Sequence, residues 1–356
     1  MLYLFIYVAL AGLAFAAGGK APADRGGYLV ALILLSVFVA FRFEVGCDWY
    51  GYSNQFNLAG LQLEYSLPST GREPLWWLLL KSQQKLGLPY YWMNIVPAGV
   101  LFLGLHALAR RQPDRLHFLA FCFPVLIINV GITQVRQGLA VGIICFAFIA
   151  FQQKRPILFG GLVLLASGFH SSALAFLLLT PLMPGRLSLR NVLLASLLAL
   201  PGLYLLVTSD VAEVAVDRYI VRDVDAAGAL FRIALLAFAS VGFLLFLRLI
   251  WEERFPEDYK LIYLGSLLML IPLPLALQSS VIGDRFAYYL IPLQAMMFAR
   301  VRYLIRSGEI VTLGIHLILG SFLGVWIILS SHFNQCYLPY RTWLFGAPVS
   351  ENYLYG

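Results

Sequence analysis

Acidic and aromatic side chains suited to binding a sugar follow a long apolar run near the N-terminus. Arg42 ends that run, and Asp48, Tyr52 and Phe56 follow at four-residue intervals, so they would share one face of a helix. Together with Trp49 they offer rings that stack on pyranose faces and a carboxylate that accepts hydroxyl protons. The alternative is a loop helix that Asp48 caps and whose rings lie at a membrane interface. Both interpretations stay open.

Glu73 and His170 are further candidates for acid–base chemistry. Glu73 stands between Arg72 and Pro74, and His170 precedes Ser171. Carboxylates and imidazoles accept protons from hydroxyl groups, and a protonated imidazole binds phosphate. The structural alternatives are that Glu73 begins a helix with Pro74 in its first turn, and that His170 is hydrogen-bonded within a tight turn.

Two arginines stand where apolar runs begin. Arg136 precedes Gly138 and Gly142, a pair of small residues that permits close helix packing. Such packing would bring Arg136 against protein instead of lipid, whereas the alternative is that its side chain snorkels to the interface. Arg285 follows Asp284, with which it could simply pair. Arg232 and its neighbours offer another cationic group, in a stretch that is equally consistent with a solvated charge run.

The composition requires an apolar solvent. Of 356 residues, 61% are hydrophobic and 12% are charged, whereas globular chains carry roughly 25% charged residues. A water-soluble fold could not bury so much apolar surface, so the composition predicts an all-α polytopic membrane protein. The net charge of +7 comes from basic residues spread among short loops, which fits membrane orientation better than nucleic-acid binding.

Twelve apolar runs are expected to cross the bilayer, and segment 74–86 is expected to form an interfacial or re-entrant helix. That segment has only 13 residues and two lysines, whereas a straight span needs about 20 apolar residues. Counting basic residues does not distinguish this arrangement from one in which 74–86 crosses; length favours the first, with both termini outside. The expected spans are 2–17, 28–41, 91–108, 116–132, 134–152, 156–169, 171–184, 190–208, 229–250, 260–278, 286–304 and 309–330.

In this arrangement residues 1–356 form a single transmembrane domain with three outer segments. These are 42–90 with its interfacial helix, the loop 209–228 and the tail 331–356. Arg136, His170 and Arg285 then lie in short outer turns. Arginines on the outer side oppose the usual orientation rule, so an anionic partner on that face would explain them.

Four cysteines are present. Cys47 and Cys336 both fall outside in this arrangement, where a disulfide can form, although the sequence leaves their pairing open. Cys122 and Cys145 are expected to be buried. Since no two cysteines are spaced as CxxC and no histidine neighbours them in a cluster, we expect no metal site.

In these motifs the chain resembles the EpsG-like branch of the Wzy-type polysaccharide polymerases of bacterial envelopes. Cys47 stands where that family usually has a small residue or Thr, and Pro74 where Gly is common. Neither departure changes a charge. The resemblance rests on Arg42, Gly46-Cys47-Asp48, Tyr52 and Phe56; Arg72-Glu73-Pro74; Arg136-Gln137-Gly138-Leu139-Ala140; Phe169-His170-Ser171-Ser172-Ala173; and Arg285 with Tyr288 or Tyr289.

The resemblance implies a glycosyltransferase of GT-C-like architecture in the bacterial inner membrane, with its active site facing the periplasm. Such an enzyme transfers a growing glycan from undecaprenyl pyrophosphate to the non-reducing end of a lipid-linked repeat unit, without a cofactor or a metal. Its partners would be the lipid-linked oligosaccharide, membrane lipid and a chain-length regulator protein. We expect pyrophosphate binding by Arg136 and Arg285 with Arg42 or Arg72, a base among His170, Asp48 and Glu73, and glycan binding by Trp49, Tyr52 and Tyr289.

Two other classes of function stay open. A transporter or flippase for polysaccharide or lipid-linked oligosaccharide would place charged groups near the bilayer midplane and show repeat symmetry. A membrane acyltransferase that modifies a glycan would combine a histidine with an acidic or Asn partner and a cytosolic donor path. The charged groups here stand mainly at the ends of apolar runs, which favours the polymerase.

Overall fold

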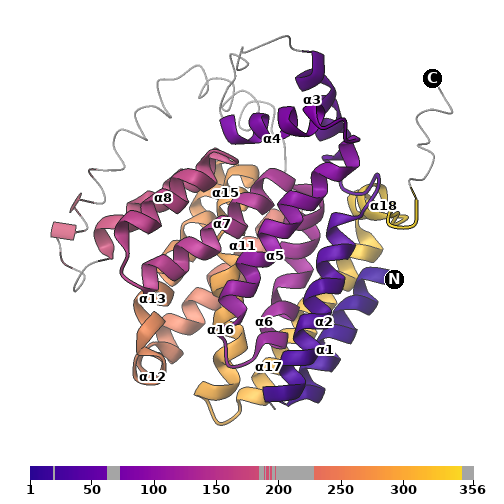
Figure 1. Ribbon diagram of the computed structural model, residues 1–356. Helices are drawn as coiled ribbons and strands as arrows, with labels where there is room; N and C mark the ends of the chain where they lie inside the picture. The colour runs from indigo at the N-terminus through magenta and orange to yellow at the C-terminus, as the bar shows by residue number, and fades with distance from the viewer. Residues whose placement is uncertain are drawn as a thin grey trace. The chain divides into compact units, whose positions relative to one another are not determined.

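The computed structural model of the chain is helical (Figure 1). It describes residues 1–18, 21–61, 73–183 and 228–346, together with residues 188, 190, 191, 193, 194 and 197. Within these residues every named element is a helix, and the one β interaction is an isolated bridge between Arg42 and Thr342. The all-α prediction is therefore confirmed for this part of the chain.

The chain divides into two compact units, with boundaries inside α7 and α16. The first unit comprises Met1–Gly142 and Phe298–Gly356, and the second comprises Ile143–Met297. Elements of the first unit are α1 (Leu2–Ala17), α2 (Ala21–Ala40), α3 (Trp49–Leu61), α4 (Pro74–Lys85), η1 (Tyr90–Asn94), α5 (Ile95–Ala109), α6 (Arg115–Cys122), η2 (Phe123–Thr133), the start of α7 (Val135–Gln152), the end of α16 (Ile291–Leu304), α17 (Gly308–Leu329) and α18 (Ser331–Tyr337).

In the first unit α6 and η2 form the centre. α1 packs against α6 and α17, and α2 packs against α5 and α6. Every residue of η2 is buried. α4 begins at Pro74, whose missing N–H costs nothing in a first helical turn. It runs crosswise to α2 and α5 in Figure 1. The helix expected over 74–86 is thus present; its place at a membrane interface stays a prediction.

The second unit continues from α7 into a set of shorter helices. After the end of α7 come α8 (Pro156–Ser167), η3 (Ser171–Leu182), α11 (Ala229–Gly242), η5 (Phe243–Leu247), α12 (Arg248–Arg254), α13 (Pro256–Leu270), α14 (Pro272–Gln278), α15 (Ser280–Tyr288) and the start of α16. α8 packs along η3, and α11 packs against α13 and α15.

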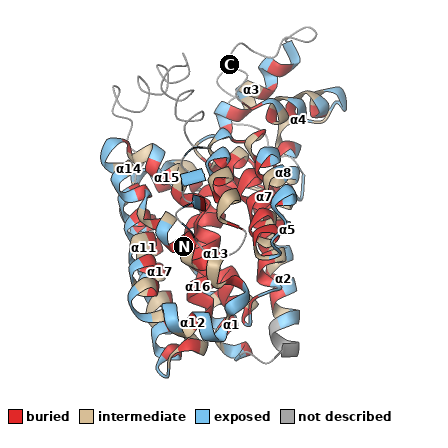
Figure 2. Cartoon of the chain, turned by 90° about the vertical axis from the view of Figure 1, so that its left-hand side faces the viewer, coloured by how far each residue is buried: buried red, intermediate tan, exposed pale blue. Residues whose placement is uncertain are grey.

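Six continuous helical stretches among the described residues are long and apolar enough to cross a membrane. They are Tyr90–Ala109, Arg115–Thr133, Val135–Gln152, Ala229–Arg254, Pro256–Gln278 and Gly308–Leu329. Many residues along α11 and α17 are exposed (Figure 2), and large apolar side chains such as Leu230, Phe238 and Leu317 are among them. Exposed apolar surface of this kind suits lipid. The chain is a membrane protein; the count of twelve spans stays a prediction.

Several expected boundaries differ from those of the structure. The expected span 286–304 is interrupted, because α15 ends at Tyr288 and α16 starts at Ile291, with Pro292 in its first turn. Four apolar helices are shorter than the usual span, at Leu2–Ala17, Arg25–Ala40, Pro156–Ser167 and Ser171–Leu182. Residues 209–227 of the expected outer loop and most of the span 190–208 lie outside the described residues. The single-domain organisation and the sidedness of the loops stay predictions.

Candidate functional site

Arg136 and Glu73 form an ion pair in the first unit. Glu73 immediately precedes α4 and Arg136 is the second residue of α7, and the guanidinium Nη1 donates to the Glu73 carboxylate. The Glu73 side chain is 10% exposed and that of Arg136 is 29% exposed. The Nε atom of Arg136 is buried without a hydrogen-bond partner in the structure. The sequence marks both residues individually, and the structure brings them together.

Aromatic side chains of α3 and α4 pack beside the Arg136–Glu73 ion pair. The Arg136 guanidinium lies 5.4 Å from the centroid of the Tyr52 ring, which packs edge-on against Trp76. Trp76 donates through Nε1 to Gln55 at 3.1 Å. Burial raises the pKa of the Tyr52 hydroxyl, and the nearby Arg136 charge opposes that rise. Tyr52 therefore stays a neutral hydrogen-bonding group beside the arginine at neutral pH.

Close glycine packing fixes the start of α7. A Cβ on Gly138 would lie 3.0 Å from the Val130 carbonyl oxygen, and a Cβ on Gly142 would lie 2.5 Å from that of Val100. Both positions therefore allow α7 to approach η2 and α5 more closely than a larger residue would. The close helix packing expected from these small residues is confirmed, and Arg136 at the same end of α7 contacts Glu73 and Tyr52.

Arg42 is buried in the loop between α2 and α3. It is 1% exposed, and it donates through Nη1 to the Val39 carbonyl at 2.6 Å and through Nε to that of Val45 at 3.2 Å. Burial lowers the pKa of the Arg42 guanidinium to about 10, so it stays charged at neutral pH. Gly46 completes the turn with a φ of 107°, a region that glycine enters without strain. These contacts show that Arg42 organises the loop; its role in binding pyrophosphate stays a prediction.

Asp48 and Trp49 differ in their accessibility. Asp48 is exposed one residue before α3, and its carbonyl accepts a bond from the Tyr52 amide. Trp49 is buried and packs edge-on against Tyr90 with ring centroids 5.0 Å apart. A packing role thus accounts for Trp49, and glycan binding by Trp49 or Tyr52 stays a prediction. Arg72 lies outside the described residues.

In the second unit His170 begins a chain of hydrogen bonds. Its Nδ1 lies 2.7 Å from the Ser172 hydroxyl, which donates to the Tyr289 hydroxyl oxygen at 3.2 Å. His170 is 8% exposed and Tyr289 is fully buried. The structure therefore brings together two residues that the sequence marks separately. With Nδ1 engaged, a base would have to use Nε2 of His170.

Asp284 pairs with Arg232 across α15 and α11. Two bonds join them, from Nε to Oδ1 at 2.9 Å and from Nη2 to Oδ2 at 2.7 Å, and the Tyr288 hydroxyl donates to Oδ2 at 2.7 Å. Both charged side chains are buried. Arg232 thus has a structural partner, which explains a buried cation that the sequence placed in either a phosphate site or a charge run. Arg285, on the same helix as Asp284, is partly exposed.

A hydrogen-bond network that the sequence did not indicate joins α18 to η2 in the first unit. Tyr337 on α18 donates through its hydroxyl to Asn129 Oδ1 at 3.0 Å and accepts from the Thr133 hydroxyl at 2.8 Å. Both partners belong to η2, which ends just before α7 and Arg136. No local spacing signals a contact between residues so far apart in the chain. The convergence of Arg136, His170 and Arg285 on one pocket stays a prediction.

Each unit thus contains a group of side chains that could act on an anionic or hydroxyl-bearing substrate. The first holds an arginine with one carboxylate partner above an aromatic ring, an arrangement that can bind an anionic group through its remaining N–H donors. The second holds an imidazole within a hydroxyl chain, which can accept or orient a proton.

Comparison with known proteins gives one match. The family model for the EpsG family matches residues 27–342, a range that contains Arg42, Glu73, Arg136, His170 and Arg285. No curated protein and no solved structure matches the chain.

Proposed function

Since the chain belongs to the EpsG family of Wzy-like polymerases, we propose that it polymerises a polysaccharide from lipid-linked repeat units. The growing glycan is transferred from undecaprenyl pyrophosphate to the non-reducing end of a new lipid-linked unit. The reaction takes place at the periplasmic face of the bacterial inner membrane. The lipid-linked oligosaccharide is the substrate, and a chain-length regulator protein is a further partner.

The reaction exchanges a sugar–phosphate bond for a glycosidic bond. The bond between the reducing-end C1 and the pyrophosphate oxygen breaks, and a bond forms between that C1 and the acceptor hydroxyl oxygen. The hydroxyl proton passes to a base, and undecaprenyl pyrophosphate leaves with an additional negative charge. A group that stabilises this charge lowers the barrier most directly.

The observation that carries the proposal is Arg136 in its setting. Arg136 lies at the start of α7 with its side chain 29% exposed, its Nη1 bound to Glu73 and its Nε buried without a hydrogen-bond partner in the structure. A phosphate oxygen suits such a group because guanidinium binds phosphate through two parallel hydrogen bonds. Arg285, partly exposed on α15, is the second arginine in this role.

The contacts of Glu73, Asp48 and His170 indicate which of them could accept the proton of the acceptor hydroxyl. The Glu73 carboxylate is already bound to Arg136, which suits a residue that positions the arginine. Asp48 is exposed and His170 lies in the Ser172–Tyr289 chain. We therefore expect Asp48 or His170 to take the acceptor proton.

Deletion of the gene, followed by electrophoresis of the surface polysaccharide, tests this function. The expected result is loss of the chain-length ladder with retention of single repeats, and complementation with Arg136→Ala or Arg285→Ala should not restore the ladder. Lys85→Ala is the control, because it removes an exposed cation from α4 and should restore the ladder. Normal ladders from both arginine variants would reject the assignment.

Export is the second candidate, and one observation favours it. His117 Nδ1 and His316 Nε2 lie 2.8 Å apart within the first unit, and the Tyr7 hydroxyl lies 2.9 Å from His316 Nδ1. Buried ionisable groups within membrane helices are common in transporters. If the deletion strain lacks single repeats as well as polymer on its surface, transport replaces polymerisation as the function.

A further inference from the structure

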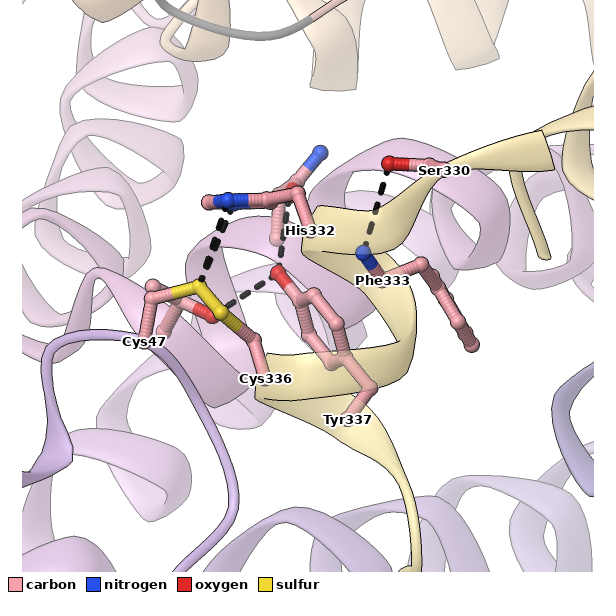
Figure 3. The surroundings of a disulfide bond; sticks show 8 residues. Cys47, Ser330, His332, Phe333, Cys336 and Tyr337 are labelled. Carbon is pink, nitrogen blue, oxygen red and sulfur yellow. Dashed lines mark hydrogen bonds between the residues drawn. A yellow bond between two sulfur atoms is a disulfide. The ribbon is translucent and has the colours of Figure 1, made fainter.

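Three side chains that can serve as metal ligands lie close together in the first unit. Cys47 lies in the loop before α3, and His332 and Cys336 lie on α18. Their ligand atoms lie within 4.8 Å of one another. His332 Nε2 is 3.2 Å from Cys47 Sγ, and Figure 3 shows the imidazole beside the two sulfur atoms. No metal site was expected from the sequence, because no two cysteines are spaced as CxxC and no histidine neighbours them in a cluster.

The backbone around the cluster positions these side chains. His332 and Cys336 are four residues apart on a helix, so they share one face. The Ser330 hydroxyl caps α18 by accepting from the Phe333 amide at 3.3 Å. The Gly46 amide donates to the Cys336 carbonyl at 2.7 Å. The bond from the Gly46 amide, which does not involve sulfur, holds the loop before α3 beside α18.

In the structure Cys47 and Cys336 form a disulfide, with Cα atoms 4.7 Å apart. This settles the pairing that the sequence left open, and in this state the sulfurs are not thiolates. Reduction by a dithiol transfers two electrons and two protons to the bond, which yields two thiols here and a disulfide in the reductant.

We propose that the reduced cluster is a zinc site, with Cys47, His332 and Cys336 as ligands. Zinc binding displaces the two thiol protons, so two thiolates and the neutral imidazole hold the ion. Three protein ligands leave the fourth tetrahedral position for water. Thiolate and imidazole together favour Zn²⁺ over Mg²⁺ or Ca²⁺, which prefer oxygen.

Exposure supports an exchangeable site. His332 is exposed and both cysteines are partly exposed, so an ion can reach them. Cys122 and Cys145 are buried and are not part of the disulfide. The loop of residues 42–48 and α18 can therefore be linked in two ways. The Cys47–Cys336 disulfide links them in the oxidised protein, and a bound metal ion links them in the reduced protein. The proposal is independent of the polymerase activity.

Metal analysis of the purified full-length protein tests the proposal. The protein in detergent, carrying Cys122→Ser and Cys145→Ser, is reduced with dithiothreitol, freed of reductant without air and equilibrated with Zn²⁺ or Co²⁺. We expect a single zinc ion per reduced chain, a thiolate-to-cobalt charge-transfer band with Co²⁺, and neither in the oxidised protein. Absence of the band from reduced protein overturns the proposal.

Two variants separate metal binding from general effects on folding. His332→Gln removes one ligand and should lose most of the zinc, whereas Asn334→Ala changes an exposed neighbour on the same helix and should retain it. Formation of the Cys47–Cys336 disulfide in oxidised His332→Gln, seen as a mobility shift on reduction, shows that the fold is intact. Equal zinc content in His332→Gln and the parent protein also overturns the proposal.

Discussion

The guanidinium of Arg136 combines two requirements that conflict in a membrane protein. It contacts Glu73 and Tyr52, yet its side chain is 29% exposed. An arginine that only stabilised the fold would be expected to bond fully within the protein, as Arg232 does with Asp284. The contrast between these two arginines indicates which one is available to an anionic ligand.

The geometry of the Arg136 side chain should matter beyond its charge. Arg136→Lys keeps the positive charge but lacks the planar fork that binds two phosphate oxygens together. We expect this variant to produce shorter chains than the wild type on gels of surface polysaccharide, with protein levels unchanged on immunoblots. Lys85→Ala is the matched control. A wild-type ladder from Arg136→Lys would show that charge alone suffices.

The Arg232–Asp284 pair should contribute to stability. Both side chains are buried, so Asp284→Ala leaves a buried cation without its partner and should lower the free energy of unfolding by about 3–5 kcal/mol. Thermal unfolding in detergent measures the change, with exposed Glu253→Ala as control. The double variant Arg232→Met/Asp284→Leu should recover much of the loss. Equal stability of Asp284→Ala and wild type would contradict this role.

At the scale of elements, α7 depends on close contact with α5. A Cβ at position 142 would lie 2.5 Å from the Val100 carbonyl, whereas a Cβ on Gly99 has no atom within 4 Å. Gly142→Ala should therefore destabilise the protein by about 1–3 kcal/mol through overpacking. Gly99→Ala should be neutral or stabilising by up to about 1 kcal/mol, since alanine favours helix.

Thermal unfolding of these two glycine variants in the same detergent compares them directly. Because Gly142 lies on α7 with Arg136, Gly142→Ala should also shorten the polysaccharide ladder. A Gly142→Ala protein as stable as Gly99→Ala would mean that α5 and α7 can separate freely.

The sequence predicted the helices better than it predicted which side chains contact one another. Apolar runs and proline positions placed the helices, including α4 at Pro74, because those signals are local. It also marked Glu73, Arg136, His170 and Tyr289 individually. It could not show that Asp284 pairs with Arg232 instead of the adjacent Arg285, or that Cys47 meets His332, because such contacts depend on how distant helices pack.

At the scale of the whole molecule, the expected sidedness requires that α8 cross the membrane. The expected arrangement puts residue 153 inside and residue 171 outside, although α8 between them has 12 residues and is only about 18 Å long at 1.5 Å per residue. In a chain lacking Cys122 and Cys145, Gln153→Cys should react with an impermeant maleimide only after the membrane is opened. Ser171→Cys should react in intact spheroplasts. Labelling of both from one side would mean that α8 and η3 re-enter without crossing.

We propose that this chain alone joins lipid-linked repeats. The direct measurement gives purified protein in lipid vesicles a single sugar source, undecaprenyl-pyrophosphate-linked repeat units, and follows the products by mass spectrometry. We expect lipid-linked glycans of two or more repeats, with free undecaprenyl pyrophosphate released in step with each new bond and no product from Arg136→Ala. Repeat units that remain unjoined in the presence of folded wild-type protein would contradict it.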